Sequence, residues 1–323
     1  MKAYVYREYG SADVLKLTEV EKPVPKDNEV LIKIMAVSVN SADIRYMRGK
    51  PRIFRLMFGF FKPAINILGA DVAGIVEAVG SAAKKFKPGD EVYGFLSDHG
   101  FGGFAEYVST TEDQLVKKPA GIPFEEAAAV PLASYTALAA LRNKGNIQPG
   151  QSVLINGASG GVGTFAIQIA KYLGAEVTAV SSSGKEELVR SLGADHFIDY
   201  KTTDFTKSGR KYDLIAGVNG YHPLSHYLRS LKDNGIYIMV GGKNPQIFHA
   251  LLFGKVSTLF SNKKIICLTD TATGSDLDFI SELLVTGKIK PVIEKRYSFD
   301  ELPDAVRYCD EGHPAGKAVV RIN

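Results

Sequence analysis

Residues 152–163, with the sequence SVLINGASGGVG, combine residue types and spacing that suit phosphate binding. An apolar run at 152–155 precedes four glycines within seven positions, and apolar residues at helical spacing follow them. Ala158, Gly160 and Gly163 match the dinucleotide fingerprint G-x-G-x-x-G with alanine in its first place. Small residues let the backbone approach a pyrophosphate, and a helix start offers free N–H groups and a positive dipole end. A purely structural turn has the same composition, so the neighbouring elements must decide.

Strands and helices alternate along the chain after this turn. We expect strands at 175–180, 196–199, 212–217 and 235–240, with helices at 186–192 and 224–231. Alternation of this kind predicts a doubly wound parallel sheet with right-handed crossovers. The glycine-rich turn therefore lies where such a sheet binds a dinucleotide.

The first third of the chain has a different pattern. Short alternating or apolar runs between turn residues predict strands at 2–6, 15–20, 29–39, 71–79, 91–95 and 104–108. No long helical segment separates them. Their spacing predicts a small, mostly antiparallel barrel-like domain.

The composition suits an enzyme that binds small molecules. The length of 323 residues suggests two domains, and the net charge of +4 comes from Lys and Arg spread along the chain. This balance favours neither nucleic acid nor a membrane surface as a partner. Cys267 and Cys309 are too few for a disulfide framework or a cysteine-based metal cluster. Without a signal-peptide pattern or a membrane-spanning run, we expect a cytoplasmic protein.

Several motifs give the chain a resemblance to a known family. They are VNSAD at 39–43, GADVAGIVEAVG at 69–80, FKPGDEVYG at 86–94, GGFAEYV at 102–108, PLASYTALAAL at 131–141 and LGADHFIDY at 192–200. In this order and spacing they resemble the medium-chain dehydrogenases/reductases, in particular the zinc-independent quinone oxidoreductase-like branch. The resemblance implies a GroES-like catalytic domain from 1–122 and 268–323 and a Rossmann domain from 123–267. It further implies a cofactor in the cleft between them and a homodimer.

The zinc ligands of the family's alcohol dehydrogenases are replaced in this sequence. Asn40 stands in the position of the Cys ligand, and Ala70 and Asp71 stand in place of a His-Glu pair. The four-cysteine structural zinc lobe is also missing. His99, in a glycine-rich loop, can serve as a substrate or metal contact, but a solvated loop residue is the simpler interpretation. We therefore expect no metal.

Hydride transfer without zinc needs an electron-poor acceptor and a hydrogen-bond donor where negative charge develops. A quinone or an α,β-unsaturated carbonyl meets the first requirement. The resemblance makes Asn40 the candidate donor beside the nicotinamide. Asp43 and Tyr46 complete the candidate catalytic set, with a purely local structural role as the alternative for Asp43. Tyr46 stands one position away from the family's tyrosine.

The end of the second Rossmann strand indicates the cofactor. NAD enzymes place an acidic residue there to hold the ribose 2′-hydroxyl, whereas this chain has Ser181. Hydroxyls and a lysine suit a 2′-phosphate, so we expect NADPH. The resemblance implies that Ser182, Lys185 and Tyr200 surround this phosphate, with solvent as the alternative for Lys185. The family's basic residue usually stands one position earlier, at Gly184.

The remaining cofactor contacts come from the turn, from strand ends and from the family pattern. They are Thr136, Ala158, Ser159, Gly160, Gly161, Val162, Asn219, Gly241, Gly242, Leu268 and Lys317. A strand-face charge is the alternative for Lys317.

Two apolar-basic segments stand out. Residues 52–67 are the least family-like stretch, whereas the resemblance places 247–264 where family dimers pair or where the cleft is lined. Each fits either plain packing or a substrate wall or interface. We expect an NADPH-dependent reductase of small hydrophobic quinones or enones. A zinc-free alcohol dehydrogenase and a non-catalytic NADPH-binding sensor or scaffold are the alternatives.

Overall fold

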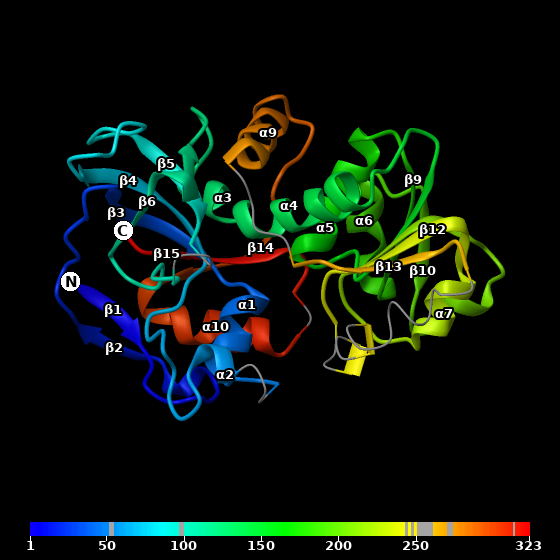
Figure 1. The fold of residues 1–323 in the computed structure, drawn as a ribbon, viewed down its shortest axis with the longest axis horizontal. Coiled ribbons are helices and arrows are strands. Elements are labelled where there is room, and N and C mark those ends of the chain that lie inside the picture. Colours follow the sequence, from blue (N-terminus) through cyan, green and yellow to red (C-terminus); the bar gives the residue numbers. More distant parts are fainter. Residues whose placement is uncertain are drawn as a thin grey trace. The chain divides into compact units, whose positions relative to one another are not determined.

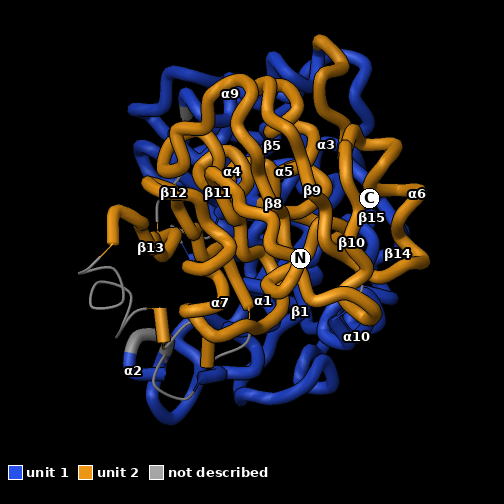
Figure 2. The backbone as a smooth tube through the Cα atoms, turned by 90° about the vertical axis from the view of Figure 1, so that its right-hand side faces the viewer, with its two compact units in different colours: residues 1–132, 271–285, 291–323 blue, residues 133–270, 286–290 orange. Residues whose placement is uncertain are grey.

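The computed structural model describes residues 1–51, 55–96, 100–242, 245–246, 249–250, 261–269, 274–312 and 314–323. Backbone contacts divide the chain into two compact units (Figure 2). Unit 1 contains 1–132, 271–285 and 291–323, and unit 2 contains 133–270 and 286–290. The sequence places the corresponding transitions at 122 and 268, and it does not separate the short segment 286–290 from the C-terminal part.

Unit 1 is built on a seven-stranded sheet in the order β14-β15-β3-β4-β5-β7, with β6 also paired to β3 (Figure 1). Its strands are β3 (Glu29–Ser38), β4 (Asp71–Val79), β5 (Glu91–Phe95), β6 (Tyr107–Thr111), β7 (Leu115–Lys117), β14 (Ile293–Ser298) and β15 (Lys317–Arg321). All pairs are antiparallel except β14 with β15. A separate hairpin joins β1 (Lys2–Val5) and β2 (Lys16–Glu19). The mostly antiparallel barrel-type domain is thus confirmed.

Five α-helices lie wholly within unit 1 among the described residues. They are α1 (Ser41–Arg48), α2 (Arg55–Phe58), α3 (Phe124–Ala128), α9 (Gly274–Val285) and α10 (Leu302–Asp310). Leu302, Ala305 and Val306 of α10 follow helical spacing and join the core that includes Ile32 and Val72 of the sheet. Removing this apolar surface from water is the main force that holds α10 on the sheet.

One predicted strand of unit 1 is displaced along the chain. The sequence predicts a strand at 104–108, whereas β6 is Tyr107–Thr111. Two backbone N–H groups, of Gly103 and Phe104, donate to the carbonyls of Gly69 and Leu68 at 3.0 and 2.8 Å. A Cβ on Gly103 would lie 2.8 Å from the Gly69 carbonyl oxygen, so only glycine permits this approach. The chain therefore joins β3 only after this contact.

Unit 2 contains a fully parallel six-stranded sheet in the order β10-β9-β8-β11-β12-β13. The strands are β8 (Ser152–Asn156), β9 (Glu176–Ser181), β10 (His196–Asp199), β11 (Tyr212–Gly217), β12 (Leu231–Met239) and β13 (Lys264–Cys267). The predicted doubly wound sheet is confirmed. Strand β12 begins four residues earlier than the predicted 235, because Leu231 already pairs with Tyr212 before a register shift.

Helices alternate with the strands of this sheet along the chain (Figure 1). They are α5 (Gly161–Tyr172), α6 (Glu186–Ser191) and α7 (Leu224–Arg229), while α4 (Pro131–Leu138) continues into a π-helical turn at Ala139–Lys144. Leu224 and Tyr227 of α7 pack on Leu154, Ile215 and Tyr237 of the sheet. Within the described part of the chain, no helix has both the length and the apolarity to cross a membrane.

Candidate active site

The turn between β3 and α1 places Asn40 at the start of a helix. Asn40 is the N-cap of α1, and its backbone N–H donates to Asp43 Oδ2 at 2.8 Å. The other oxygen of Asp43 accepts from the N–H groups of Gly69 and Ala70, at 2.9 and 3.1 Å. Asp43 therefore joins the turn to the segment before β4, as expected of a structural residue.

Residues from β3, β4 and β15 surround the amide of Asn40. Lys317 Nζ donates to Asn40 Oδ1 at 2.6 Å and to Asp71 Oδ2 at 3.2 Å. Asn40 Nδ2 donates to Asp71 Oδ2 at 2.9 Å and to the Ser38 carbonyl at 3.3 Å, while the Ser38 hydroxyl donates to Asp71 Oδ2 at 2.7 Å. We call Ser38, Asn40, Asp71 and Lys317 the polar network.

Nearly the whole polar network is removed from solvent. Asp71 and Ser38 are 0% exposed, Lys317 is 4% exposed and Asn40 is 8% exposed. A buried charge is costly unless it is paired and hydrogen-bonded, and here the ammonium and the carboxylate meet both conditions. Burial raises the pKa of nearby Asp43 to about 7, although its bonds to backbone N–H groups and the Lys317 charge oppose the rise. Asn40 is thus the most accessible member of a rigid, charged arrangement.

The polar network does not suit a catalytic zinc ion. Zinc in dehydrogenases is held by thiolates, imidazoles and carboxylates. Here the equivalent positions supply the amide of Asn40 and the carboxylate of Asp71, and the Lys317 ammonium already bonds both oxygens. A second cation at the same oxygens would be repelled by this ammonium. The residues therefore support chemistry without zinc at this position.

The structure gives Lys317 two partners that the sequence did not predict. Its ammonium bonds to Asn40 and Asp71, and its expected contact with the cofactor stays a prediction. Asn40 is expected to be a donor, and both hydrogens of its amide already have acceptors within the protein. The longer bond, 3.3 Å to the Ser38 carbonyl, is the weaker of the two by distance.

Tyr46, the third predicted catalytic residue, packs against the unit 1 core. Its ring lies 4.6 Å from that of Phe101, measured between centroids. This packing shows how Tyr46 is positioned, and its contact with a substrate stays a prediction. His99, residues 52–54 and most of the predicted apolar-basic segment 247–264 lie outside the described residues.

Two glycines of the glycine-rich turn of unit 2 differ in the space around them. A Cβ on Gly163, in the first turn of α5, would lie 2.2 Å from the Gly157 carbonyl oxygen. A Cβ on Gly160, the N-cap of α5, would meet no atom closer than 3.8 Å. Gly163 is thus required for helix–strand packing, whereas Gly160 borders open space at a helix N-terminus. Ser159, Gly161 and Val162 beside it are partly exposed, and Ala158 is buried.

The turns after β8, β11 and β12 meet at the carboxyl edge of the sheet. The backbone N–H of Asn219 donates to the Asn156 carbonyl at 3.0 Å, and that of Gly241 donates to the Gly217 carbonyl at 3.0 Å. A Cβ on Gly242 would lie 3.1 Å from the Gly220 carbonyl. The structure therefore brings the predicted contacts Asn219, Gly241 and Gly242 together with the glycine-rich turn.

The ends of β9 and β10 form the next part of this edge. The backbone N–H of Tyr200 donates to the Ser181 carbonyl at 3.2 Å, so these two predicted residues lie side by side. Ser181 is 3% exposed and Tyr200 is 52% exposed. Ser182 caps the short helix at Ser183–Lys185, where Lys185 is partly exposed.

Two further predicted contacts lie elsewhere in unit 2. Thr136 is partly exposed within α4, and the backbone N–H of Leu268 donates to the Met239 carbonyl at 3.0 Å just beyond β13. Both residues belong to unit 2, and their contacts with a cofactor stay predictions.

Sequence reasoning missed a polar cluster beneath the carboxyl edge. Asn156 Nδ2 donates to the Tyr227 hydroxyl at 3.2 Å, and the rings of Tyr227 and Tyr237 stack at 4.1 Å. Gln246 Nε2 donates to the Tyr237 hydroxyl at 3.2 Å. Burial raises the pKa of Tyr227 to about 12, so its hydroxyl stays protonated at neutral pH. Tyr227 lies in α7 and Tyr237 in β12, and nothing in the residues around either one predicts that the two rings stack.

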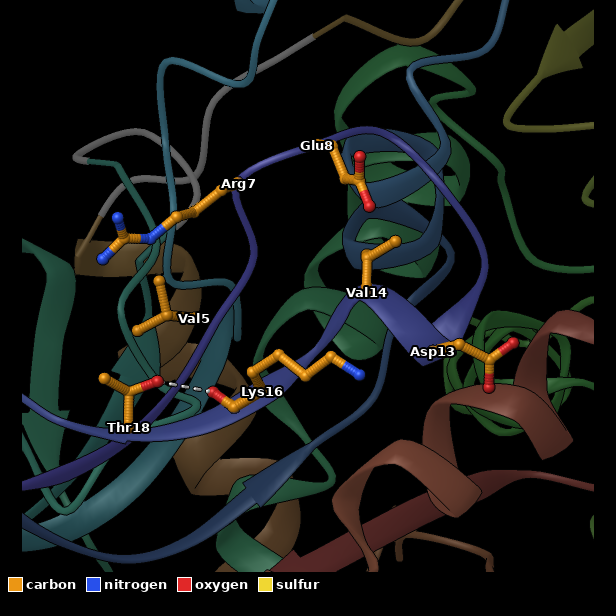
Figure 3. Close-up of a pocket in the computed structure, with 7 residues that line it drawn as sticks. All are labelled: Val5, Arg7, Glu8, Asp13, Val14, Lys16 and Thr18. Carbon is orange, nitrogen blue, oxygen red and sulfur yellow. Dashed lines mark hydrogen bonds between the residues drawn. The ribbon is translucent and has the colours of Figure 1, made fainter.

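A separate open pocket on unit 1 does not contain any predicted site residue (Figure 3). Val5, Arg7, Glu8, Asp13, Val14, Lys16 and Thr18 line it. Its charges are of both signs, and Asp13 already accepts from Arg307 at 2.9 Å. The polar groups do not converge on one point in Figure 3, so this pocket gives no basis for assigning chemistry.

Comparison with known proteins agrees with a GroES-like domain and a Rossmann-like domain in this chain. Residues 26–120 match the family described as alcohol dehydrogenase GroES-like domain, and residues 192–320 match the family described as zinc-binding dehydrogenase. The chain belongs to the medium-chain dehydrogenase/reductase superfamily and is an oxidoreductase. For the zinc in the second family's description, the polar network offers a single carboxylate, Asp71, which is already paired with Lys317.

Relatives place the chain in the quinone oxidoreductase branch of this superfamily. It is 38% identical to the chloroplast envelope quinone oxidoreductase homolog of Arabidopsis thaliana over 331 residues, covering 99% of this chain and 98% of the relative. It is 34% identical to the chloroplastic NADPH-dependent alkenal/one oxidoreductase of the same plant, covering 99% and 79%. The solved quinone oxidoreductase from Coxiella burnetii has a TM-score of 0.89 at 27% identity, covering 100% of this chain and 99% of that structure.

Proposed function

We propose that the protein transfers hydride from NADPH to a small hydrophobic quinone or α,β-unsaturated carbonyl without a catalytic metal. The observation that carries this proposal is the buried polar network, in which Lys317 binds the oxygens of Asn40 and Asp71 where zinc enzymes bind metal. The quinone and alkenal/one reductases among the relatives support the same acceptor class. A nicotinamide cofactor, when bound, supplies the hydride.

Asn40 has the position and electrostatics to stabilise charge on the acceptor. Hydride addition to a β-carbon or a quinone ring leaves negative charge on the acceptor oxygen. The Lys317 ammonium polarises the Asn40 amide through Oδ1, which strengthens Nδ2 as a donor. We propose that the Nδ2–H now held by the Ser38 carbonyl at 3.3 Å turns to the acceptor oxygen. Because the enolate or hydroquinone anion formed by hydride addition then takes its proton from water, the protein needs no strong general acid.

The carboxyl edge of unit 2 has the features to hold the cofactor. Open space beside Gly160 at the α5 N-terminus suits the pyrophosphate. Ser181 and Tyr200 lie together where the ribose is expected, and the hydroxyls with Lys185 suit a 2′-phosphate. The proposal of NADPH over NADH rests on these residue types.

The first test of this function is NADPH consumption with four acceptors: a 1,4-quinone, a 2-alkenal, a cyclic enone and a simple aldehyde, with NADH in parallel. We expect turnover of the first three, a preference for NADPH and no loss of activity after treatment with a chelator. Aldehyde turnover would favour the zinc-free alcohol dehydrogenase. NADPH binding without any turnover would favour the sensor or scaffold.

A substitution at Ser181 tests the cofactor preference separately. Ser181→Asp places a negative charge where the 2′-phosphate is proposed, and we expect NADPH affinity to fall about 10-fold or more relative to NADH. Ser191→Asp adds the same charge at an exposed position of α6 and serves as the control. An unchanged ratio of the two affinities in Ser181→Asp would contradict this assignment. The homodimer and the cytoplasmic location stay predictions, and several relatives are named as chloroplastic or mitochondrial.

A further inference from the structure

Two histidines and an aspartate of unit 2 converge near the carboxyl edge of its sheet, where the N–H of His222 donates to Gln246 Oε1 at 3.2 Å. One possible ligand atom from each of Asp204, His222 and His226 lies within 4.8 Å of the other two. Asp204 comes from the connection between β10 and β11, whereas His222 lies just before α7 and His226 lies in its first turn. The three residues are separated from one another by up to 22 positions in the chain, so the fold alone brings them together.

We propose that Asp204, His222 and His226 form a binding site for a divalent transition-metal ion such as Zn²⁺. Two imidazoles and one carboxylate are a donor set that binds zinc and its neighbours in the first transition row. This ion would be distinct from catalytic zinc, because no member of the polar network takes part.

The spacing of the ligands is close to what an ion needs. Ligand atoms about 2.1 Å from a tetrahedral zinc lie about 3.4 Å apart. Asp204 Oδ1 and His222 Nδ1 are already 3.9 Å apart. Closing the remaining gaps, about 1.4 Å at most from the 4.8 Å limit, needs only side-chain adjustment. All three residues are partly exposed, which leaves a route for the ion and room for water as a fourth ligand.

Neighbouring groups hold the ligands in place. Asp204 Oδ1 accepts from the N–H and the hydroxyl of Thr206 at 3.0 and 2.7 Å, so the carboxylate orientation is fixed. The Thr206 hydroxyl also lies 3.4 Å from His226 Nδ1. The His222 ring packs edge-on against Phe205, with ring centroids 4.9 Å apart. Support of this kind around metal ligands increases affinity because less ordering is required on binding.

A bound ion would join the 200–211 connection to α7 within unit 2. Both segments contact the sheet through Phe205 and Tyr227, which belong to the same apolar core. Ion binding to the folded state alone stabilises that state by mass action. The expected role is therefore structural, and the test does not depend on catalytic turnover.

The test uses the full-length, tag-free protein after dialysis against a chelator. Titration with Zn²⁺ in a calorimeter is expected to show one ion per chain with micromolar or tighter affinity, and Co²⁺ is expected to give visible absorption on binding. His222→Ala and His226→Gln should each weaken Zn²⁺ binding by about 100-fold. Saturating Zn²⁺ should also raise the Tm of the wild type but not of either variant.

The control is His196→Ala. His196 is an exposed histidine outside the proposed site, and its Nε2 lies 2.7 Å from Glu176 Oε1. This variant should bind Zn²⁺ like the wild type. Far-UV circular dichroism and the metal-free Tm show whether each variant folds, and Asp204→Asn provides a third ligand variant if one fails. Absence of one-to-one binding in the wild type, or wild-type affinity in folded His222→Ala and His226→Gln, would overturn the proposal.

Discussion

Replacing Lys317 by methionine tests whether the buried ammonium holds the polar network together. Methionine keeps the unbranched apolar chain and removes the charge. Asp71, which is 0% exposed, then loses its cation but keeps donors from Ser38, Asn40 and the Leu132 backbone N–H at 2.7–2.9 Å. Breaking a buried ion pair on one side costs about 3–5 kcal/mol, and the retained donors favour the lower end.

The unpaired oxygen of Asn40 adds to this cost. Its Oδ1 loses the 2.6 Å bond from Lys317, a loss of about 1 kcal/mol. We therefore expect Lys317→Met to lower the free energy of unfolding by about 3–4 kcal/mol. Urea unfolding followed by far-UV circular dichroism measures this loss. Turnover with a quinone should fall as well, because Asn40 is no longer polarised.

A double-mutant cycle separates the ion pair from simple loss of packing. The double variant Lys317→Met, Asp71→Asn lacks both charges. Its loss of unfolding free energy should therefore be about 2–3 kcal/mol smaller than the sum of the losses in the two single variants. Arg321→Met, at the exposed end of β15, removes a cation from the same strand and should change stability by less than about 0.5 kcal/mol. Additive single effects, or a Lys317→Met loss below about 1 kcal/mol, would refute this account of the network.

Two further predictions concern unit 2. Gly163→Ala should destabilise the protein by about 1–3 kcal/mol, because its Cβ would lie 2.2 Å from the Gly157 carbonyl, whereas Gly160→Ala should keep wild-type stability and weaken NADPH binding. Thermal unfolding and fluorescence titration measure these effects, and equal destabilisation by both variants would contradict the assigned roles. Although burial opposes it, bonds from Lys232 and from the N–H and hydroxyl of Ser152 hold the pKa of Asp213 below its usual value. The folded-state pKa is below the unfolded value near 4, so this stabilisation is present above about pH 4 and is lost as the pH falls through the folded pKa. Asp213→Asn should therefore be less stable than wild type at pH 7 and approach it in acid, and a constant difference across this range in urea unfolding would contradict the prediction.

The parallel sheet of unit 2 was predictable because its signals are local. The strands at 196–199 and 212–217 have the predicted bounds, and the glycine pattern marks the start of α5. Positions with no room for a side chain, such as Gly163, leave a direct trace in the sequence. Strand starts that depend on pairing are less visible, as the earlier start of β12 shows.

The sequence by itself determined the two-part architecture, the dinucleotide-type turn and the loss of zinc ligands at Asn40 and Ala70. Each of these depends on residue type, on spacing or on short-range periodicity. Only the tertiary structure decided that Lys317 joins Asn40 and Asp71, which precede it by 277 and 246 positions. The meeting of Asp204 with His222 and His226 likewise depends on how α7 packs on the sheet. These long-range contacts depend on the order of the strands and on how the helices pack, and neither can be predicted from a local sequence pattern.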